Sequence, residues 1–107
     1  MDIQTEKKLE AVLSLLAGGN PAEANSMLNE MVQYDFDTKE LDFAGRCCNF
    51  WIEPIESLAS IQNPFERGEN LLEDWKLFTD FVRGWEHFYE PAFYAAQRGV
   101  FSLARQC

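Results

Sequence analysis

The four residues that decide the fold are Gly18-Gly19-Asn20-Pro21, which separate two apolar patterns near the start of the chain. Paired glycines are typical of a helix end, because glycine readily adopts the left-handed conformation found there. Asparagine followed by proline is typical of a helix start, since asparagine caps free N–H groups and proline fits the first position. Apolar residues at helical spacing lie on both sides of this stretch: Leu9, Val12, Leu13 and Leu16 before it, and Ala24, Met27, Leu28 and Met31 after it. The stretch therefore predicts a turn between two helices.

The middle of the chain has the pattern of a helix that is buried on more than one side. Apolar side chains from Leu41 to Ile52 fall on two faces of such a helix, which indicates packing between neighbours. Asp37 and Glu40 have the spacing of a capping box at its start. We expect Pro54 to end or kink this helix. A further short helical piece is expected from Ile55 to Ile61.

The last third of the chain predicts two more helices. Asn63-Pro64 repeats the asparagine–proline pair and should begin a long helix that reaches Trp85 or His87. Glu90-Pro91 should begin the final helix. No segment alternates between apolar and polar residues over a useful length, so no strand is expected. The predicted fold class is all-α.

Composition and charge limit the function. The chain has 107 residues and a mass of 12.4 kDa, enough for one domain with a real core. It has 9 Lys and Arg against 18 Asp and Glu, a net charge of −9, which disfavours nucleic acid and anionic membranes as partners. It lacks an apolar run of transmembrane length, and its charged N-terminus is unlike a signal peptide, so a cytoplasmic location is expected.

The first half of the chain resembles the tetratricopeptide repeat (TPR) family. The resemblance rests on the stretch from Gly19 to Ala24, then Leu28 and Met31, and the turn at residues 35–37. A second set of positions is similar to the first helix of a TPR: Leu41, Ala44, Gly45 and Cys48. The resemblance covers residues 5–50 well and residues 64–106 loosely.

The resemblance implies an antiparallel helix-hairpin array of about five to six helices that forms a TPR-like superhelix. Within a single domain, residues 1–107, it implies a first repeat at 1–37, a second repeat at 38–87 with an insertion at 53–62, and a terminal helix at 90–107. An unrelated five-helix bundle remains the alternative.

The resemblance also implies a peptide-binding groove, because the first helix of each TPR hairpin lines a concave face. The candidate groove residues in this sequence are Lys39, Asp42, Arg46, Asn49, Tyr94, Arg98 and Phe101. The equivalent positions counted from Leu9 are Lys7, Glu10, Ser14 and Ala17, and Pro91 is the remaining position counted from Phe93. Arg46 and Arg98 occupy equivalent places and could bind a ligand carboxylate. The alternative is that both arginines are solvated and pair with Asp42 or Glu90.

Aromatic residues are unusually dense between Trp75 and Phe101, where nine occur in 27 residues. One interpretation is a thick core beneath an extended fourth helix. The other is an exposed surface for protein binding or self-association into a homo-oligomer. The candidate interface residues are Trp75, Phe78, Phe81, Trp85, Phe88 and Tyr89.

Residues for catalysis or metal binding are sparse. His87 is the one histidine, and no glutamate begins a Glu-x-x-His motif. A nucleophilic pair of Cys48 and His87 has no supporting motif, and adjacent Cys47 and Cys48 fit reduced thiols in the core better than a disulfide. The chain is therefore predicted not to be an enzyme and to need no metal or cofactor.

Two functions follow from these observations. The first is a non-enzymatic protein–protein interaction module of TPR type, which binds a peptide or partner helix in its groove or self-associates through its aromatic face. The alternative is an acidic TPR-like chaperone or inhibitor of a basic or aggregation-prone protein, whose binding would weaken strongly with salt. The expected partner in both is a protein or peptide.

Overall fold

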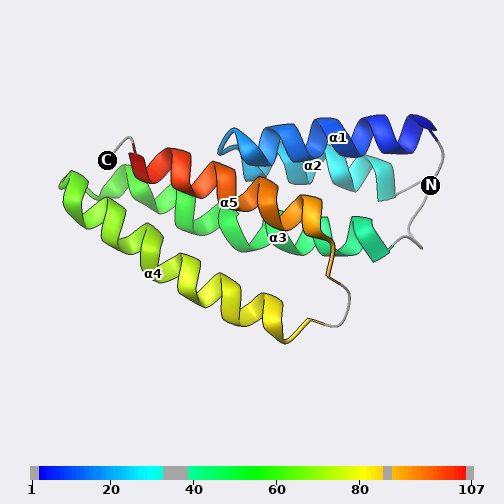
Figure 1. The fold of residues 1–107 in the computed structure, drawn as a ribbon. Coiled ribbons are helices and arrows are strands. Elements are labelled where there is room, and N and C mark those ends of the chain that lie inside the picture. The colour runs from blue at the N-terminus through cyan, green and yellow to red at the C-terminus, as the bar shows by residue number, and fades with distance from the viewer. Residues whose placement is uncertain (1–2, 33–38, 86–87, 106–107) are drawn as a thin grey trace.

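In the part of the chain that the structure describes, there are five α-helices and one short 3-10 helix (Figure 1). The computed structural model describes residues 3–32, 39–85 and 88–105, and within these ranges it contains no strand, which confirms the all-α class. None of the helices there is both long and apolar enough to span a membrane. The helices are α1 (Ile3–Ala17), α2 (Pro21–Val32), α3 (Lys39–Ser57), α4 (Pro64–Arg83) and α5 (Glu90–Arg105), with the 3-10 helix η1 at Leu58–Ser60.

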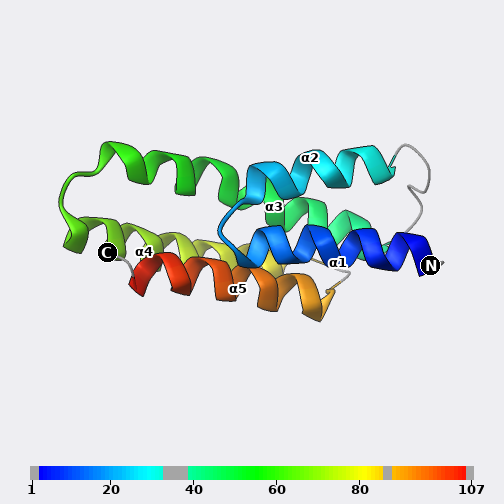
Figure 2. The same cartoon turned by 90° about the horizontal axis from the view of Figure 1, so that it is seen from above.

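The helices alternate in direction along the chain. In Figures 1 and 2, α1, α3 and α5 run one way along the long axis, while α2 and α4 run the other way. The molecule is elongated, with extents of 44 × 25 × 18 Å. The predicted array of antiparallel hairpins is therefore confirmed.

The final helix packs back onto the first one. Helix α5 makes its most extensive contact with α1 and also contacts α3 and α4, whereas α1 and α3 have little direct contact. In a linear helical-repeat array each repeat contacts only its neighbours. The return of α5 to α1 was not predicted, and it creates the surface on which the candidate site lies.

The turn between α1 and α2 has the predicted structure. Gly19 has φ of 81°, a left-handed conformation that other residues adopt only with strain. The N–H groups of Gly19 and Asn20 donate to the carbonyl oxygens of Leu16 and Leu15 at 3.0 and 2.9 Å, which closes the end of α1. Helix α2 then begins at Pro21, as predicted.

Helix α4 begins as predicted but ends earlier. The side chain of Asn63 accepts hydrogen bonds from the N–H groups of Phe65 and Glu66 at 2.8 and 3.3 Å, with Pro64 at the first helical position. The expectation that the helix reaches Trp85 was wrong, because it ends at Arg83. Gly84 caps this end, and its N–H donates to the carbonyl of Phe81 at 3.2 Å. His87, the other predicted end, lies outside the described residues.

Pro54 neither ends α3 nor separates a second helix. The helix continues through Pro54 to Ser57, and η1 follows directly, so the piece predicted at residues 55–61 is divided between them. Proline removes one backbone hydrogen bond, here the one that an N–H at position 54 would donate to the carbonyl of Phe50. The hydroxyl of Ser57 donates to the Pro54 carbonyl at 2.9 Å. Of the residues predicted as an insertion, 53–62, Glu53 to Ser57 continue α3 and Leu58 to Ser60 form η1.

The core is centred on aromatic side chains from three helices. Trp51 of α3 and Phe78 of α4 are fully buried, and their ring centroids lie 5.4 Å apart. Phe93 of α5 stacks on Phe78 at 5.9 Å. The first hairpin adds a second part of the same core: Leu9, Val12, Leu16, Ala24, Leu28 and Met31. These contacts hold the hairpins and α5 in one body.

Candidate functional site

Two adjoining cavities follow the line where α5 lies beside α1, and we call them together the α1/α5 groove. The larger, of about 400 Å³, is lined by Glu6, Leu9, Glu10, Leu13, Glu40 and Tyr89. The smaller, of about 280 Å³, is lined by Leu13, Ser14, Ala17, Pro91, Tyr94, Ala95 and Arg98. Because Leu13 lines both, the cavities meet at this side chain. We call the larger cavity the acidic end and the smaller one the arginine end.

The residues that line the groove recur along α1 and α5 at helical spacing. On α1, four lining residues recur at intervals of four, three and four: Glu6, Glu10, Leu13 and Ala17. This spacing places them on one helical face. On α5 the lining residues are spaced by three and four, which also places them on one face: Pro91, Tyr94 and Arg98. Helices α1 and α5 lie side by side and run in the same direction (Figure 2), so these two faces come next to each other.

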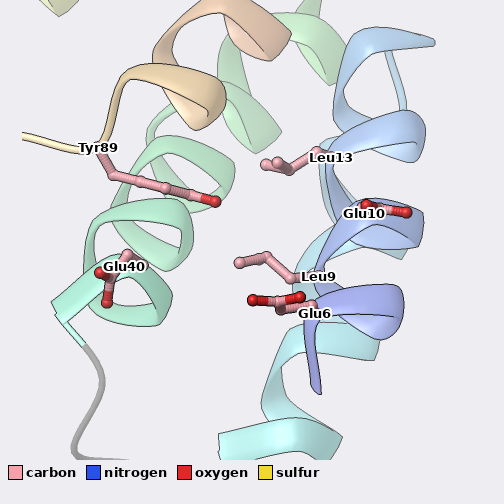
Figure 3. Close-up of a pocket in the computed structure, with 6 residues that line it drawn as sticks. All are labelled: Glu6, Leu9, Glu10, Leu13, Glu40 and Tyr89. Atoms are coloured by element: carbon pink, nitrogen blue, oxygen red, sulfur yellow. The ribbon is translucent and has the colours of Figure 1, made fainter. Parts of the chain in front are cut away.

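The acidic end combines negative charge with an aromatic hydroxyl. Tyr89, just before α5, extends its ring toward α1, while the Glu6 carboxylate lies across from it and Glu40 lies at the start of α3 (Figure 3). Burial of Tyr89 raises its pKa, and the charges of Glu40, Glu6 and Glu10 raise it further. The phenol therefore stays neutral at physiological pH and keeps a proton to donate. Leu9 and Leu13 give the cavity an apolar wall.

The structure brings together part of the predicted groove. Tyr94, 51% exposed, and Arg98, also exposed, both line the arginine end. Phe101 lies elsewhere, since it is half-buried with its ring centroid 5.2 Å from that of Trp75. The predicted groove positions of the first helix contribute as well: Glu10, Ser14 and Ala17 line the two cavities.

The predicted groove residues of α3 lie apart from these cavities. Lys39, Asp42, Arg46 and Asn49 are all exposed, and none lines either cavity. Arg46 contacts this chain's own residues: its Nε is 3.5 Å from a carboxylate oxygen of Asp42, and its Cζ is 3.5 Å from the centre of a Trp85 ring. The two arginines predicted to be equivalent therefore have different surroundings, and Arg98 is the one that faces the groove.

Most of the predicted aromatic interface packs inward. Phe78 is fully buried, and the core also takes in the partly buried rings of Trp75, Phe81, Trp85 and Tyr89. Phe88 is the exception, with 53% of its surface exposed. The large exposed apolar side chains of α4 are Phe65, Leu72 and Leu77, none of which is a predicted interface residue. The aromatic density thus serves mainly the core of this chain.

Cys47 and Cys48 are buried in α3, as predicted, and burial raises both thiol pKa values. The pKa of Cys48 is raised to about 12, and that of Cys47 is raised as well, first by burial and then by repulsion from the Cys48 thiolate once that forms. The thiolate is the reactive form of cysteine, so neither side chain is a ready nucleophile. The proposed partner of Cys48, His87, lies outside the described residues. Among the residues described, no group of three or more His, Cys, Asp or Glu could hold a metal ion.

We expect Cys47 and Cys48 to resist thiol reagents in the folded protein. At pH 8 a thiol with a pKa of about 12 is ionised in about one molecule in ten thousand, and here it is also inaccessible. In a Cys107→Ser variant, Ellman's reagent should label these thiols only as fast as the chain unfolds, and guanidinium should speed the reaction greatly. Fast labelling of either cysteine without denaturant would contradict the burial.

Sequence reasoning missed Glu6, Leu13 and Glu40 as site residues. Leu13 was assigned to the core stripe, and Glu40 to a capping box with Asp37, which lies outside the described residues. The sequence did carry one signal, the repeat of Glu6 and Glu10 one turn apart beside the apolar stripe. Its meaning depends on α5 lying next to α1, which no local pattern reveals.

Comparison with protein-family models, with curated proteins and with solved structures gives no match for this chain. The resemblance to TPR proteins therefore stays a prediction, and the proposals below rest on the residues and geometry of the chain itself.

Proposed function

We propose that the chain is a non-enzymatic protein-interaction module that binds a short segment of a partner protein in the α1/α5 groove. The observation that carries the proposal is that two cavities share Leu13 and follow the same face of α1. Leu13, Ala17, Ala95 and the exposed ring of Tyr94 supply apolar contact area in the groove. Such apolar area, edged by a few charged groups, is typical of peptide-binding sites.

The residues around the groove suit binding better than chemistry. The buried thiols of α3 are poor nucleophiles, and the groove offers carboxylates, a neutral phenol and a guanidinium. These groups form charge-assisted hydrogen bonds with polar ligand groups. The aromatic face predicted for self-association lies mostly in the core, so we place the binding surface in the groove.

Blocking the groove should abolish peptide binding. Short random peptides displayed on phage would be selected on the full chain, and their affinities measured by fluorescence anisotropy. Ser14 lines the arginine end, so Ser14→Trp should fill the groove and weaken binding at least about ten-fold, the effect of losing about 1.4 kcal/mol. The matched control is Ser26→Trp, at an exposed serine of α2 away from the groove, which should bind like the unmodified chain.

A second pair of variants guards against misfolding of the blocked chain. Tyr94→Ala removes an exposed aromatic side chain from the groove, and Phe65→Ala removes one from α4. Only the first should weaken binding. The proposal is overturned if no peptide is enriched, or if the selected peptides bind the Ser14→Trp and Tyr94→Ala variants as well as the unmodified chain. Loss of binding in Phe65→Ala alone would place the site on α4.

A further inference from the structure

The charge lining the α1/α5 groove changes sign along its length. Glu6, Glu10 and Glu40 line one end, and Arg98 lines the other, with apolar Leu13 where the two cavities meet. A net charge of −9 alone would attract basic partners without fixing their position. The arginine end would repel a basic side chain and attract a carboxylate. The groove therefore favours one arrangement of ligand charges over its reverse.

The acidic end has the shape and chemistry for a long basic side chain. Lysine and arginine bury an apolar stem while the charged head stays among polar groups. Here Leu9, Leu13 and the ring of Tyr89, which project into the same space in Figure 3, would contact the stem, and the carboxylates that line the cavity would contact the head. The three glutamates lie near enough to the Tyr89 hydroxyl for their negative charges to add to the effect of burial on its pKa.

The arginine end has the chemistry for a carboxylate. The planar guanidinium group binds carboxylates through two parallel hydrogen bonds. Tyr89 of the acidic end directly precedes Glu90, the first residue of α5. Arg98 stands eight residues after Glu90, which is about 12 Å along the helix. An extended peptide covers that length in about four residues. The distance between the ends of the groove thus sets a spacing for the ligand.

We propose that the groove binds a segment of a partner protein in which a basic residue and an acidic residue stand about four positions apart, the basic side chain in the acidic end and the carboxylate on Arg98. This inference rests on the proposed function, because it specifies the ligand of the same groove.

The test is to select peptides separately on the unmodified chain and on charge-reversed variants. The unmodified chain should enrich peptides with Lys or Arg about four residues from Asp or Glu, in one order along the peptide. Glu10→Lys should remove the preference for the basic residue, and Arg98→Glu should remove the preference for the acidic one. Each reversal should weaken the originally selected peptides about three- to ten-fold.

Matched controls separate local recognition from overall charge. Glu23→Lys on α2 and Arg105→Glu near the end of α5 make the same charge changes at exposed residues outside both cavities. Both should leave the preferences unchanged. If these controls shift the preferences as much as the groove variants do, general electrostatic attraction explains the binding and the inference is wrong.

The outcomes also separate this inference from the proposed function. Peptides that lose affinity in Ser14→Trp but carry no spaced pair of opposite charges would overturn the inference and leave the groove as the binding site. Peptides that carry the charge pair but bind Ser14→Trp normally would overturn both, since the pair would then be recognised elsewhere. Selected peptides that carry the pair, lose affinity in Ser14→Trp and respond only to the groove reversals are the expected result.

Discussion

Phe78→Ala is expected to lower the free energy of unfolding by about 3–5 kcal/mol, the usual cost of removing a fully buried phenylalanine. A domain of this size is stabilised by about 5–15 kcal/mol in total, so the variant should lose a large part of its stability. Urea unfolding followed by far-UV circular dichroism would measure the change.

The reason for this large effect is that Phe78 joins three helices. Its ring centroid lies 5.1 Å from that of Phe50 and 5.4 Å from that of Trp51, both on α3, and 5.9 Å from that of Phe93 on α5. Helix α4 has few direct contacts with α3 apart from this aromatic cluster. The cavity left by an alanine would therefore weaken the attachment of α4 to the rest of the chain.

Phe65→Ala is the matched control on the same helix. Phe65 is 73% exposed, so its removal should change stability by less than about 0.5 kcal/mol. If Phe78→Ala does not fold, Phe78→Leu keeps most of the apolar volume and should cost less than about 1.5 kcal/mol. Equal stability of Phe78→Ala and Phe65→Ala would show that Phe78 is not a core residue.

Local features of the fold were predictable because each depends on residues close together in the sequence. The Asn63-Pro64 pair begins α4, and Gly19 has the left-handed φ that ends α1. The apolar stripe from Leu9 to Leu16 predicted the buried face of α1, where Leu9, Val12 and Leu16 are buried. The prediction for the end of α4 failed because the aromatic pattern continues past Gly84 and indicated a longer helix. The helix instead ends where the N–H of Gly84 caps its last turn.

The position of α5 could not be predicted from such patterns. Its contact with α1 depends on a buried face of small residues: Ala92, Ala95, Ala96 and Gly99. Small residues permit a close approach of two helices but do not identify the partner helix, because that choice depends on the whole set of contacts.

The candidate site was predicted in part for the same reason. Tyr94, Arg98 and Ser14 were assigned to a groove by their positions within each helix, and the structure places them in one cavity. Asp42 and Arg46 were assigned by the same rule, but their helix does not flank this cavity. Position along a helix thus predicted which faces were outward, and the return of α5 decided which faces meet.

Gly99→Ala should destabilise the protein even though alanine favours helix more than glycine does. A Cβ added at Gly99 would overlap the carbonyl oxygen of Leu16 and lie 3.4 Å from the Ala17 oxygen. These backbone atoms cannot easily move, because hydrogen bonds from Gly19 and Asn20 fix the end of α1. We expect the overlap to cost about 1–3 kcal/mol, the typical cost of overpacking, against a gain of about 1 kcal/mol from helix propensity, which leaves a net loss of up to about 2 kcal/mol.

Gly68→Ala separates the two contributions, because a Cβ added at Gly68 on α4 meets no atom within 4 Å. The same substitution there should gain about 0.5–1 kcal/mol from helix propensity alone. Thermal unfolding of both variants should give changes of opposite sign if α5 packs closely on α1, and a gain in stability in both would mean that it does not.

The Gly99→Ala variant should also bind selected peptides more weakly, because the same contact sets the width of the α1/α5 groove. One substitution therefore tests both the packing of α5 on α1 and the proposed binding of peptides beside it.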